Sequence, residues 1–262
     1  MMQVYVISRP SIDWSEVNRF LSDQNVRWRR SPDAKAPDEL VELAGRVCYF
    51  SFGAHQSPRT NSEYIENLIA QGHESVLEHS AWTFLITGVS RAFTHQLVRH
   101  RVGISFSQLS QQYYDETDAE FVLPPELRGN PALEEVWRTS VQESLMAYRL
   151  IVKRLGSIGP SSTESNNAEP TKQTELRRAI RSAARSVLPN ATESKIVMTI
   201  NGRALRHFLD MRGSIIGDAE MRLVAARLLE LASTDAPAIL SDFYVEYLGD
   251  GTPIVRRRDL NR

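Results

Sequence analysis

Apolar and polar residues alternate in several stretches of this 262-residue chain, which is the pattern of half-buried β-strands. β-Branched and aromatic residues are concentrated in the same stretches. Prolines follow two of them, at Pro10 and at Pro124, and a proline ends or interrupts strand pairing. The pattern predicts strands at 2–8, 80–89, 121–123, 195–200 and 243–247.

Elsewhere, apolar residues recur every three or four positions, as on a helix with one buried face. Pro37 suits a first helical turn, Thr60 and Glu63 have the spacing of a capping box, and Ser90 is a suitable N-cap. Residues 11–36 show neither pattern, and we expect them to be irregular. Helices are predicted over 37–47, 61–72, 91–98, 131–155, 176–188, 203–211 and 218–232.

Strands and helices interleave without the regular alternation of a doubly wound fold, so the predicted class is α+β. We expect one domain over residues 1–250, with a mixed or antiparallel sheet flanked by helices. Residues 251–262, which include Arg256–Arg258, are expected to form a basic C-terminal tail. Residues 157–171 are rich in Gly, Pro, Ser and Asn and predict a surface loop or connection.

Composition narrows the function classes. Hydrophobic residues make up 42% of the chain, yet no apolar run approaches the roughly 18 residues of a membrane span. The N-terminus lacks the features of a signal peptide, and Cys48 is the only cysteine, so we expect a cytoplasmic protein without an internal disulfide. With 31 basic and 32 acidic residues, the chain has no overall basic field for a membrane surface or a nucleic acid.

Common catalytic motifs are missing. His73 and His79 are six positions apart, whereas a helical zinc motif places its histidines four apart, so we expect no metal. No nucleophile elbow or cysteine–histidine signature occurs, and Cys48 lies among apolar neighbours. The chain also lacks glycine-rich phosphate loops, so any phosphate must be bound by side chains such as arginine.

The segment 99–113, RHRVGISFSQLSQQY, is the strongest candidate for a binding site. Guanidinium and amide groups together suit an anion that also carries carbonyl acceptors, and a nucleotide has both. A second polar cluster follows at Asn201, Arg203 and His207. An alternative is an arginine-rich nucleic-acid binder that uses 99–113 and Arg256–Arg258, but the balanced charge disfavours it.

Segment 99–113 resembles the signature of the flavin-dependent thymidylate synthases, Arg-His-Arg followed after seven or eight residues by Ser; here eight residues separate Arg101 from Ser110. Four further blocks resemble the same family in the same order, at 72–79, 184–189, 201–203 and 207–212. The resemblance implies an α+β enzyme that forms a homotetramer with shared active sites. It also implies reduced FAD as hydride donor, NADPH as reductant and methylenetetrahydrofolate as carbon donor.

The implied reaction is reductive C5-methylation of dUMP to dTMP, without a thiolate nucleophile. The same chemistry on UMP, giving 5-methyl-UMP for nucleoside-antibiotic biosynthesis, is the alternative. By the family pattern, the nucleotide would contact Gln96, Arg99, Gln108, Ser110, Gln111, Gln112, Arg185 and Arg212. Arg99, Ser110, Arg185 and Arg212 would be the catalytic residues. FAD would contact His73, Ser75, Glu78, Arg99, His100, Arg101, Asn201, Arg203 and His207.

Three features depart from the family pattern. Gln112 stands where most members carry an arginine that resembles a nucleotide phosphate contact, Ile216-Gly217 replaces His-Ala, and the loop before Ser110 has the longer of the two known lengths. Replacing a charge-assisted hydrogen bond with a neutral amide costs about 1.5–3 kcal/mol if nothing compensates. The choice between dUMP and UMP therefore depends most on Gln112.

Overall fold

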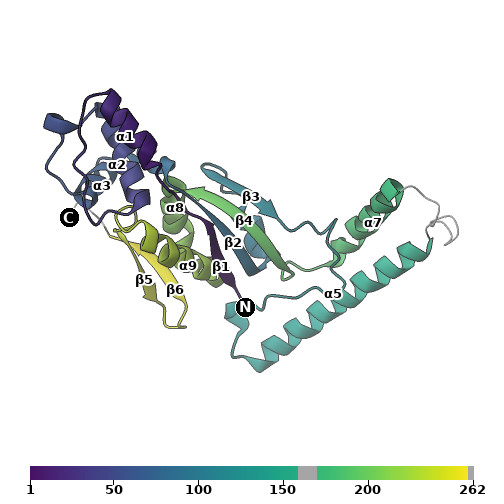
Figure 1. The fold of residues 1–262 in the computed structure, drawn as a ribbon. Helices are drawn as coiled ribbons and strands as arrows, with labels where there is room; N and C mark the ends of the chain where they lie inside the picture. The colour runs from purple at the N-terminus through teal and green to yellow at the C-terminus, as the bar shows by residue number, and fades with distance from the viewer. Residues whose placement is uncertain (159–169, 259–262) are drawn as a thin grey trace. The chain divides into compact units, whose positions relative to one another are not determined.

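Four strands of the chain form one sheet with the order β1-β2-β4-β3 (Figure 1). Along β2 and β4 every second side chain is buried, including those of Trp82, Phe84, Met198 and Ile200, as expected for the period of two in a strand. The strands are β1 (Gln3–Ser8), β2 (Ala81–Ser90), β3 (Ile104–Gln108) and β4 (Glu193–Asn201).

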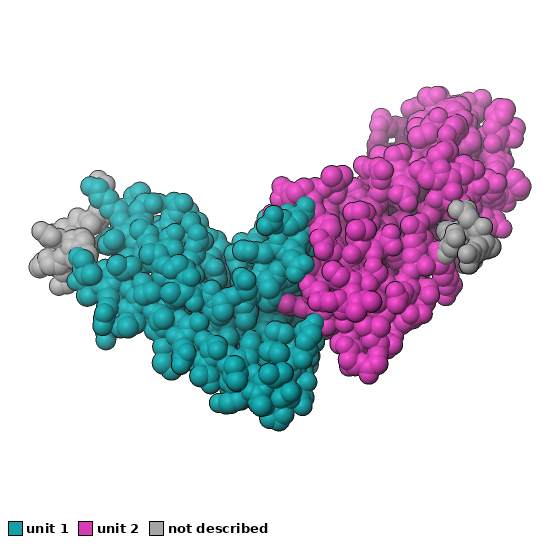
Figure 2. Space-filling view, turned by 180° about the vertical axis from the view of Figure 1, so that it is seen from behind, with its two compact units in different colours: residues 1–3, 87–99, 107–196 teal, residues 4–86, 100–106, 197–262 magenta. Residues whose placement is uncertain are grey.

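The computed structural model describes residues 1–158 and 170–258, and they divide into two compact units (Figure 2). Unit 1 consists of residues 1–3, 87–99 and 107–196, and unit 2 of residues 4–86, 100–106 and 197–262. The chain passes between the units several times, so neither unit is one continuous stretch of sequence. The predicted connection at 157–171 lies mostly outside the described residues.

Unit 1 is built on helices, and the starts of α4 and α5 agree with the sequence signals, whereas α7 begins at Pro170 instead of the predicted 176. Ser90 caps α4, where its hydroxyl accepts a hydrogen bond from the backbone N–H of Phe93. Helix α5 begins at Pro131 and packs along α7, with Val141 and Tyr148 on its buried face. The helices of this unit are α4 (Arg91–Leu97), the 3₁₀ turn η3 (Pro125–Leu127), α5 (Pro131–Ile158), α7 (Pro170–Ala184) and the 3₁₀ turn η4 (Arg185–Val187).

Unit 2 holds the remaining helices and a two-stranded antiparallel sheet, β5–β6. The capping box at Thr60 and Glu63 is confirmed, because each side chain hydrogen-bonds the backbone N–H of the other. The elements are α1 (Trp14–Asp23), α2 (Ala36–Tyr49), η1 (Gly53–His55), α3 (Asn61–Ala70), η2 (Glu74–His79), α8 (Gly202–Phe208), the π-helical turn η5 (Leu209–Gly213), α9 (Ala219–Asp235), β5 (Phe243–Tyr247) and β6 (Pro253–Arg257).

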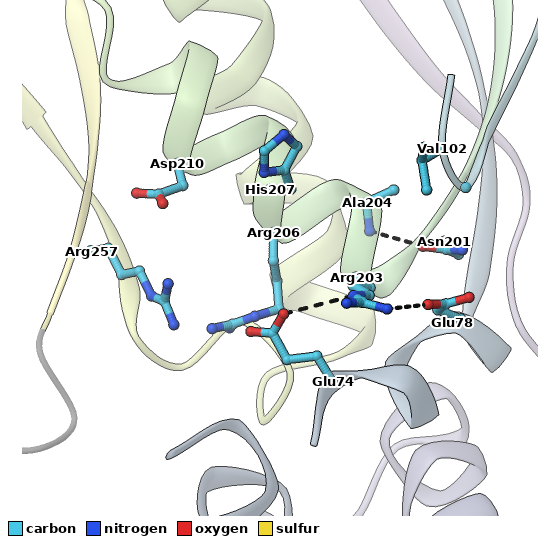
Figure 3. A pocket seen from close by; sticks show the side chains of 11 residues that line it. Glu74, Glu78, Val102, Asn201, Arg203, Ala204, Arg206, His207, Asp210 and Arg257 are labelled. Carbon is cyan, nitrogen blue, oxygen red and sulfur yellow. Dashed lines mark hydrogen bonds and ion pairs between the residues drawn. The ribbon is translucent and has the colours of Figure 1, made fainter. Parts of the chain in front are cut away.

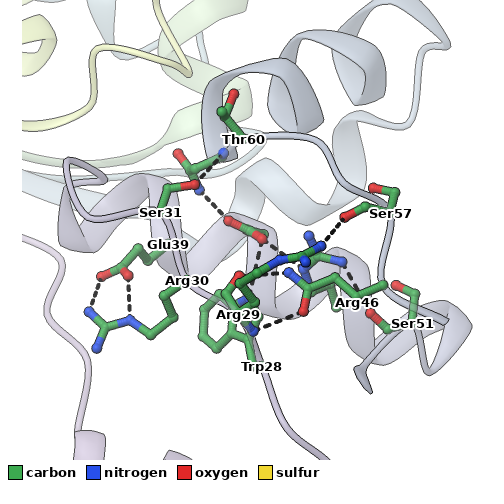
Figure 4. A network of polar contacts seen from close by, with 12 residues as sticks. Trp28, Arg29, Arg30, Ser31, Glu39, Arg46, Ser51, Ser57 and Thr60 are labelled. Carbon is green, nitrogen blue, oxygen red and sulfur yellow. Dashed lines mark hydrogen bonds and ion pairs between the residues drawn. The ribbon is translucent and has the colours of Figure 1, made fainter. Parts of the chain in front are cut away.

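A buried polar network fixes α2 within unit 2 (Figure 4). The carboxylate of Glu42 accepts hydrogen bonds from Arg46 at 2.7 Å, from Asn61 at 2.7 Å and from Trp28 at 3.2 Å. Arg46 and Glu42 are almost fully buried, so this ion pair needs its extra hydrogen bonds to offset desolvation. The charges of Arg46 and Glu42 are buried and paired with each other, so they are not available to a ligand.

The α+β prediction is confirmed, but three local predictions are wrong. Residues 14–23, expected to be irregular, form α1, because Asp13 caps the backbone N–H groups of Ser15 and Glu16. Residues 121–123 form only a single bridge, between Phe121 and Thr192. The expected tail at 251–262 is also wrong for residues 253–257, which form β6 and pair with β5. None of the described helices is long and apolar enough to cross a membrane.

Candidate functional site

Segment 99–113 crosses from unit 1 to unit 2 and back. Arg99 and residues 107–113 belong to unit 1, whereas residues 100–106 belong to unit 2. Helix α4 ends at Leu97, a turn follows, and β3 begins at Ile104. The two parts of the segment are therefore described with the unit that holds each of them.

In unit 2, a cavity of about 410 Å³ opens beside α8 and η2 (Figure 3). Its volume falls within the roughly 300–1,000 Å³ that ligand pockets have in proteins. Four predicted cofactor residues line it: Glu78, Asn201, Arg203 and His207. The other lining residues are Glu74, Val102, Gly103, Ala204, Arg206, Asp210 and Arg257.

Asn201 and Gly103 form one wall of the cavity. The Oδ1 atom of Asn201 caps α8 by accepting a hydrogen bond from the backbone N–H of Ala204 at 2.8 Å. Gly103 has a φ of +70°, and a Cβ built on it would lie 2.6 Å from Nδ2 of Asn201. A side chain at position 103 would both strain the backbone and displace this amide, so the wall requires glycine.

Arg203 carries the positive charge most exposed to the cavity. Its Nη1 atom donates to Glu78 at 2.7 Å, and its Nε atom lies 3.9 Å from Glu74, as the dashed lines in Figure 3 show. The hydrogen bond to Glu78 raises the pKa of the guanidinium. Because these pairs are solvent-exposed, they cost little to exchange for a ligand phosphate.

His100 and Arg212 are joined directly in unit 2. The Nε atom of Arg212 donates to Nε2 of His100 at 2.8 Å, which requires that ring nitrogen to be unprotonated. Burial, the charge of Arg212 and that of His207 lower the pKa of His100, so its neutral form is favoured. Arg212, a predicted nucleotide residue, is therefore hydrogen-bonded to His100, a predicted flavin residue.

The other predicted cofactor residues of unit 2 lie at the surface. His73 and Ser75 are exposed at the start of η2, and Arg101 is exposed in the turn before β3. Among the residues described, these three are not in the lining of the cavity. The structure thus brings four of the predicted cofactor residues together and adds His100 through its edge-on ring contact with His207, at 6.2 Å.

In unit 1, Ser110 begins a tight turn that presents the predicted nucleotide residues. Its carbonyl oxygen accepts hydrogen bonds from the backbone N–H groups of Tyr113 and Tyr114, and its hydroxyl accepts one from Gln112. The amide of Gln112 lies between two residues of α7. Its Oε1 atom accepts from Arg178 at 3.2 Å, and its Nε2 atom donates to Ser182 at 3.5 Å.

The side chains of Gln108 and Gln111 form hydrogen bonds with other side chains of unit 1. The Nε2 atom of Gln108 donates to Thr94 at 2.7 Å and to Ser194 at 3.1 Å, so only its Oε1 atom remains for a ligand. Gln111 is buried and hydrogen-bonds the carboxyl group of Glu116. Burial raises the pKa of Glu116, although this hydrogen bond and the charge of Arg91 oppose the rise.

The predicted arginines of unit 1 differ from those of unit 2. Arg185 is half-buried in η4, and its guanidinium group makes no hydrogen bond or ion pair with any described residue. Arg99 is exposed, and among the described residues its guanidinium group donates only to the carbonyl oxygen of His95, at 3.3 Å. Gln96 lies three residues earlier on α4 and is half-buried. Unit 1 therefore offers two guanidinium groups, those of Arg99 and Arg185, that no carboxylate of a described residue neutralises.

Comparisons with known proteins identify the family of this chain. The family model described as "Thymidylate synthase complementing protein" matches residues 32–238. Proteins named flavin-dependent thymidylate synthase from Mycobacterium avium and Mycolicibacterium gilvum are 42% and 43% identical to this chain, over 90% of its length and 90% of theirs. The chain belongs to this family. The prediction that it is an enzyme of this type is confirmed.

A flavin-dependent thymidylate synthase requires a site that fits FAD, and the cavity residues of unit 2 provide a suitable set of groups. Arg203 offers a cation for a diphosphate, while Glu78 and Asp210 offer acceptors for the hydroxyls of ribose and ribityl chains. The bare backbone at Gly103 allows close approach of a ligand. We conclude that these residues fit the cofactor.

Several residues at both places were not predicted from the sequence. Arg257 and Asp210 line the cavity, but Arg257 was expected to lie in a tail, and Asp210 was predicted as part of the block 207–212 without a role in binding. Arg178 contacts Gln112, yet the two are 66 residues apart. The only available signal was the helical spacing of Arg178, Arg181 and Arg185 along α7.

Proposed function

We propose that this protein catalyses the flavin-dependent reductive C5-methylation of dUMP to dTMP. The observation that carries the proposal is identity of 42–43% to flavin-dependent thymidylate synthases over 90% of both chains. Methylenetetrahydrofolate is the proposed carbon donor, and NADPH is the proposed reductant. Reduced FAD, when bound, supplies the hydride. Methylation of UMP is the competing outcome, and the experiment below distinguishes the two.

FAD is proposed to bind in the cavity of unit 2. Arg203 would hold the diphosphate in exchange for its exposed pairs with Glu78 and Glu74. Asn201 and His207 line the same cavity and offer further polar contacts. By the family pattern, the remaining proposed contacts are His73, Ser75, Arg99, His100 and Arg101.

In unit 1, the residues proposed to hold the nucleotide are Arg99, Arg185 and the turn at Ser110. By the family pattern, Arg212 of unit 2 is a further proposed contact. Activation of uracil at C5 moves electron density onto the ring oxygens, and fixed donors aimed at those oxygens stabilise the transition state. Arg185, which has no carboxylate partner among the described residues, is the best available donor for this role.

The hydrogen bond between His100 and Arg212 gives each residue a defined task. Neutral His100 accepts through Nε2 and so fixes the orientation of Arg212, whose Nη atoms remain for a ligand. Protonation of His100 would place two cations against each other and break this bond. We therefore propose that His100 acts as a neutral positioning residue for Arg212.

The active enzyme is proposed to be a homotetramer. Helix α5 carries large apolar side chains that are 47–67% exposed, at Leu133, Val136, Met146 and Leu150. Exposed apolar residues along one helix are typical of a surface that another protein chain covers. We expect light scattering of the holoenzyme to give a mass of four chains.

The reaction is tested by incubating FAD-loaded protein anaerobically with methylenetetrahydrofolate, NADPH and equal concentrations of dUMP and UMP. Mass spectrometry of the products should detect dTMP as the main methylated nucleotide. Methylated UMP alone would select the alternative substrate. Protein that binds FAD but methylates neither nucleotide would overturn the proposal.

A further inference from the structure

Helix α7 turns a row of arginines toward the Ser110 turn within unit 1. Arg178, Arg181 and Arg185 are spaced three and four residues apart, which places them on one side of the helical segment. Two of them contact the turn directly. Arg178 donates from Nε to Gln112 at 3.2 Å, and Arg181 donates from Nη1 to the carbonyl oxygen of Tyr113 at 2.7 Å.

Arg178 and Arg181 differ in how much of their charge is already used. Arg181 is also paired with Asp115 at 3.4 Å, and its side chain is 24% exposed. Arg178 is 41% exposed, and its one ion pair with a described residue is a long contact of 3.5 Å with Glu175, which is 63% exposed. No described residue forms a hydrogen bond with Nη2 of Arg178. The outer edge of this guanidinium is therefore available to an anion.

Gln112 and Tyr113 hold Arg178 in place. The amide of Gln112 is fixed at both ends, because Oε1 accepts from Arg178 and Nε2 donates to Ser182. The guanidinium carbon of Arg178 also lies 5.4 Å from the centre of the Tyr113 ring, within the range of a cation–π contact. An arginine restrained by two neighbours loses less side-chain entropy when it binds a ligand.

We propose that Arg178 binds the 5′-phosphate of the uracil nucleotide, and that Gln112 is the residue that positions it. The inference rests on the proposed function, which supplies the nucleotide. A guanidinium binds a phosphate through paired, charge-assisted hydrogen bonds, which an amide such as that of Gln112 cannot form. At the position where the family pattern has an arginine, this chain has a glutamine that brings in an arginine from α7.

The test measures nucleotide binding by calorimetry on the FAD-loaded holoenzyme, with dUMP and with deoxyuridine, which lacks the phosphate. Arg178→Ala should weaken dUMP binding about 10- to 100-fold, the usual effect of losing a charge-assisted pair, and should leave deoxyuridine binding within about twofold. UMP and uridine are titrated in parallel. Arg177→Ala is the matched control, because Arg177 is the exposed neighbour on α7, and it should leave both affinities unchanged.

A second variant tests the positioning role. In the Arg178→Ala background, Gln112→Arg places a guanidinium on the turn itself and should restore most of the phosphate-dependent affinity. The inference is overturned if Arg178→Ala binds dUMP as the parent does, or if it loses dUMP and deoxyuridine affinity equally, which would show support of the turn alone. If the parent holoenzyme binds neither dUMP nor UMP, it is the proposed function that fails.

Discussion

Arginines at the candidate flavin cavity of unit 2 and Arg185 of unit 1 differ in how their charges are neutralised. In unit 2, Arg203 is paired with Glu78 and Glu74, and Arg206 and Arg257 share the buried carboxylate of Asp242. In unit 1, Arg185 has no ion pair with any described residue. The candidate flavin cavity therefore exchanges existing ion pairs for a ligand, whereas Arg185 attracts an anion without that exchange.

The difference separates structural charges from binding charges. A carboxylate that two arginines share inside the protein stabilises the fold, and its removal leaves buried cations unpaired. An arginine without such a partner contributes little to the fold and much to a phosphate or a developing oxyanion. The following predictions test this separation, beginning with the largest expected effect.

Asp242→Asn should have the largest effect on stability. Asp242 is fully buried and accepts hydrogen bonds from Arg206 at 2.6 and 2.7 Å and from Arg257 at 2.8 Å. Breaking such a buried pair costs about 3–5 kcal/mol of unfolding free energy, which urea denaturation measures. Asp118→Asn is the control, because Asp118 is 94% exposed in its pair with Arg149, and its loss should change stability little.

The unfolding free energy measured at low pH gives an independent check on the role of Asp242. Burial alone would raise the pKa of Asp242, but the hydrogen bonds and charges of Arg206 and Arg257 outweigh it and lower the pKa below 3.8. Its contribution to stability is therefore present above about pH 4 and is lost as the pH falls through the lowered pKa. A variant with the parent's stability from pH 7 to pH 3 would contradict the assignment.

Arg185→Ala should have the largest effect on catalysis. Removing one fixed donor to a developing oxyanion lowers the rate about 10²- to 10³-fold. The flavin absorbance of the purified variant should stay unchanged, because Arg185 is not among the proposed FAD residues. Anaerobic single-turnover oxidation of the reduced flavin in the presence of dUMP and methylenetetrahydrofolate measures the rate. A normal rate would remove Arg185 from the site, and Arg177→Ala again serves as the control.

The elements that sequence predicted well are those with local signals. The capping box at Thr60, the cap at Ser90 and the proline at the start of α5 each act within one helical turn. Neighbouring residues in the sequence are therefore enough to predict them. Helix α1 has a comparable capping signal, since Asp13 precedes Glu16 by three positions, although residues 11–36 were predicted to be irregular.

The features that sequence could not predict depend on contacts between distant residues. Gln112 and Arg178 are 66 positions apart, and His100 and Arg212 are 112 apart. Periodicity and motif spacing describe neighbours within a helix or strand, and they carry no information on such pairs. Sequence therefore identified the substitution at Gln112 but not the arginine that contacts it.

Asp38 provides a further test in unit 2, because its carboxylate is hydrogen-bonded by backbone N–H groups instead of by an arginine. Its oxygens accept hydrogen bonds from the backbone N–H groups of Ala238 and Ile239, and burial raises its pKa to about 6. With a folded-state pKa above 3.8, its contribution to stability is lost as the pH rises from about 4 to about 6.

The cost of this ionisation is about 3 kcal/mol, from a shift of about two pKa units. As the pH rises from 4 to 7, the denaturation midpoint of the parent should therefore decrease relative to that of Asp38→Asn, whose side chain cannot ionise. Equal pH slopes for the two proteins would show that Asp38 titrates normally.

Glu74→Gln should have the smallest effect, and it tests whether cavity charges are exchanged on FAD binding. Glu74 lies 3.9 Å from Arg203 and lines the cavity, so its negative charge competes with the FAD diphosphate for the same guanidinium. Removing the charge should tighten FAD binding about two- to fivefold, and the gain should shrink in high salt because exposed charges are screened. Glu66→Gln, at an exposed position on α3, is the control. Flavin fluorescence titration measures the affinity, and weaker binding by Glu74→Gln would instead identify the carboxylate as an acceptor for the flavin hydroxyls.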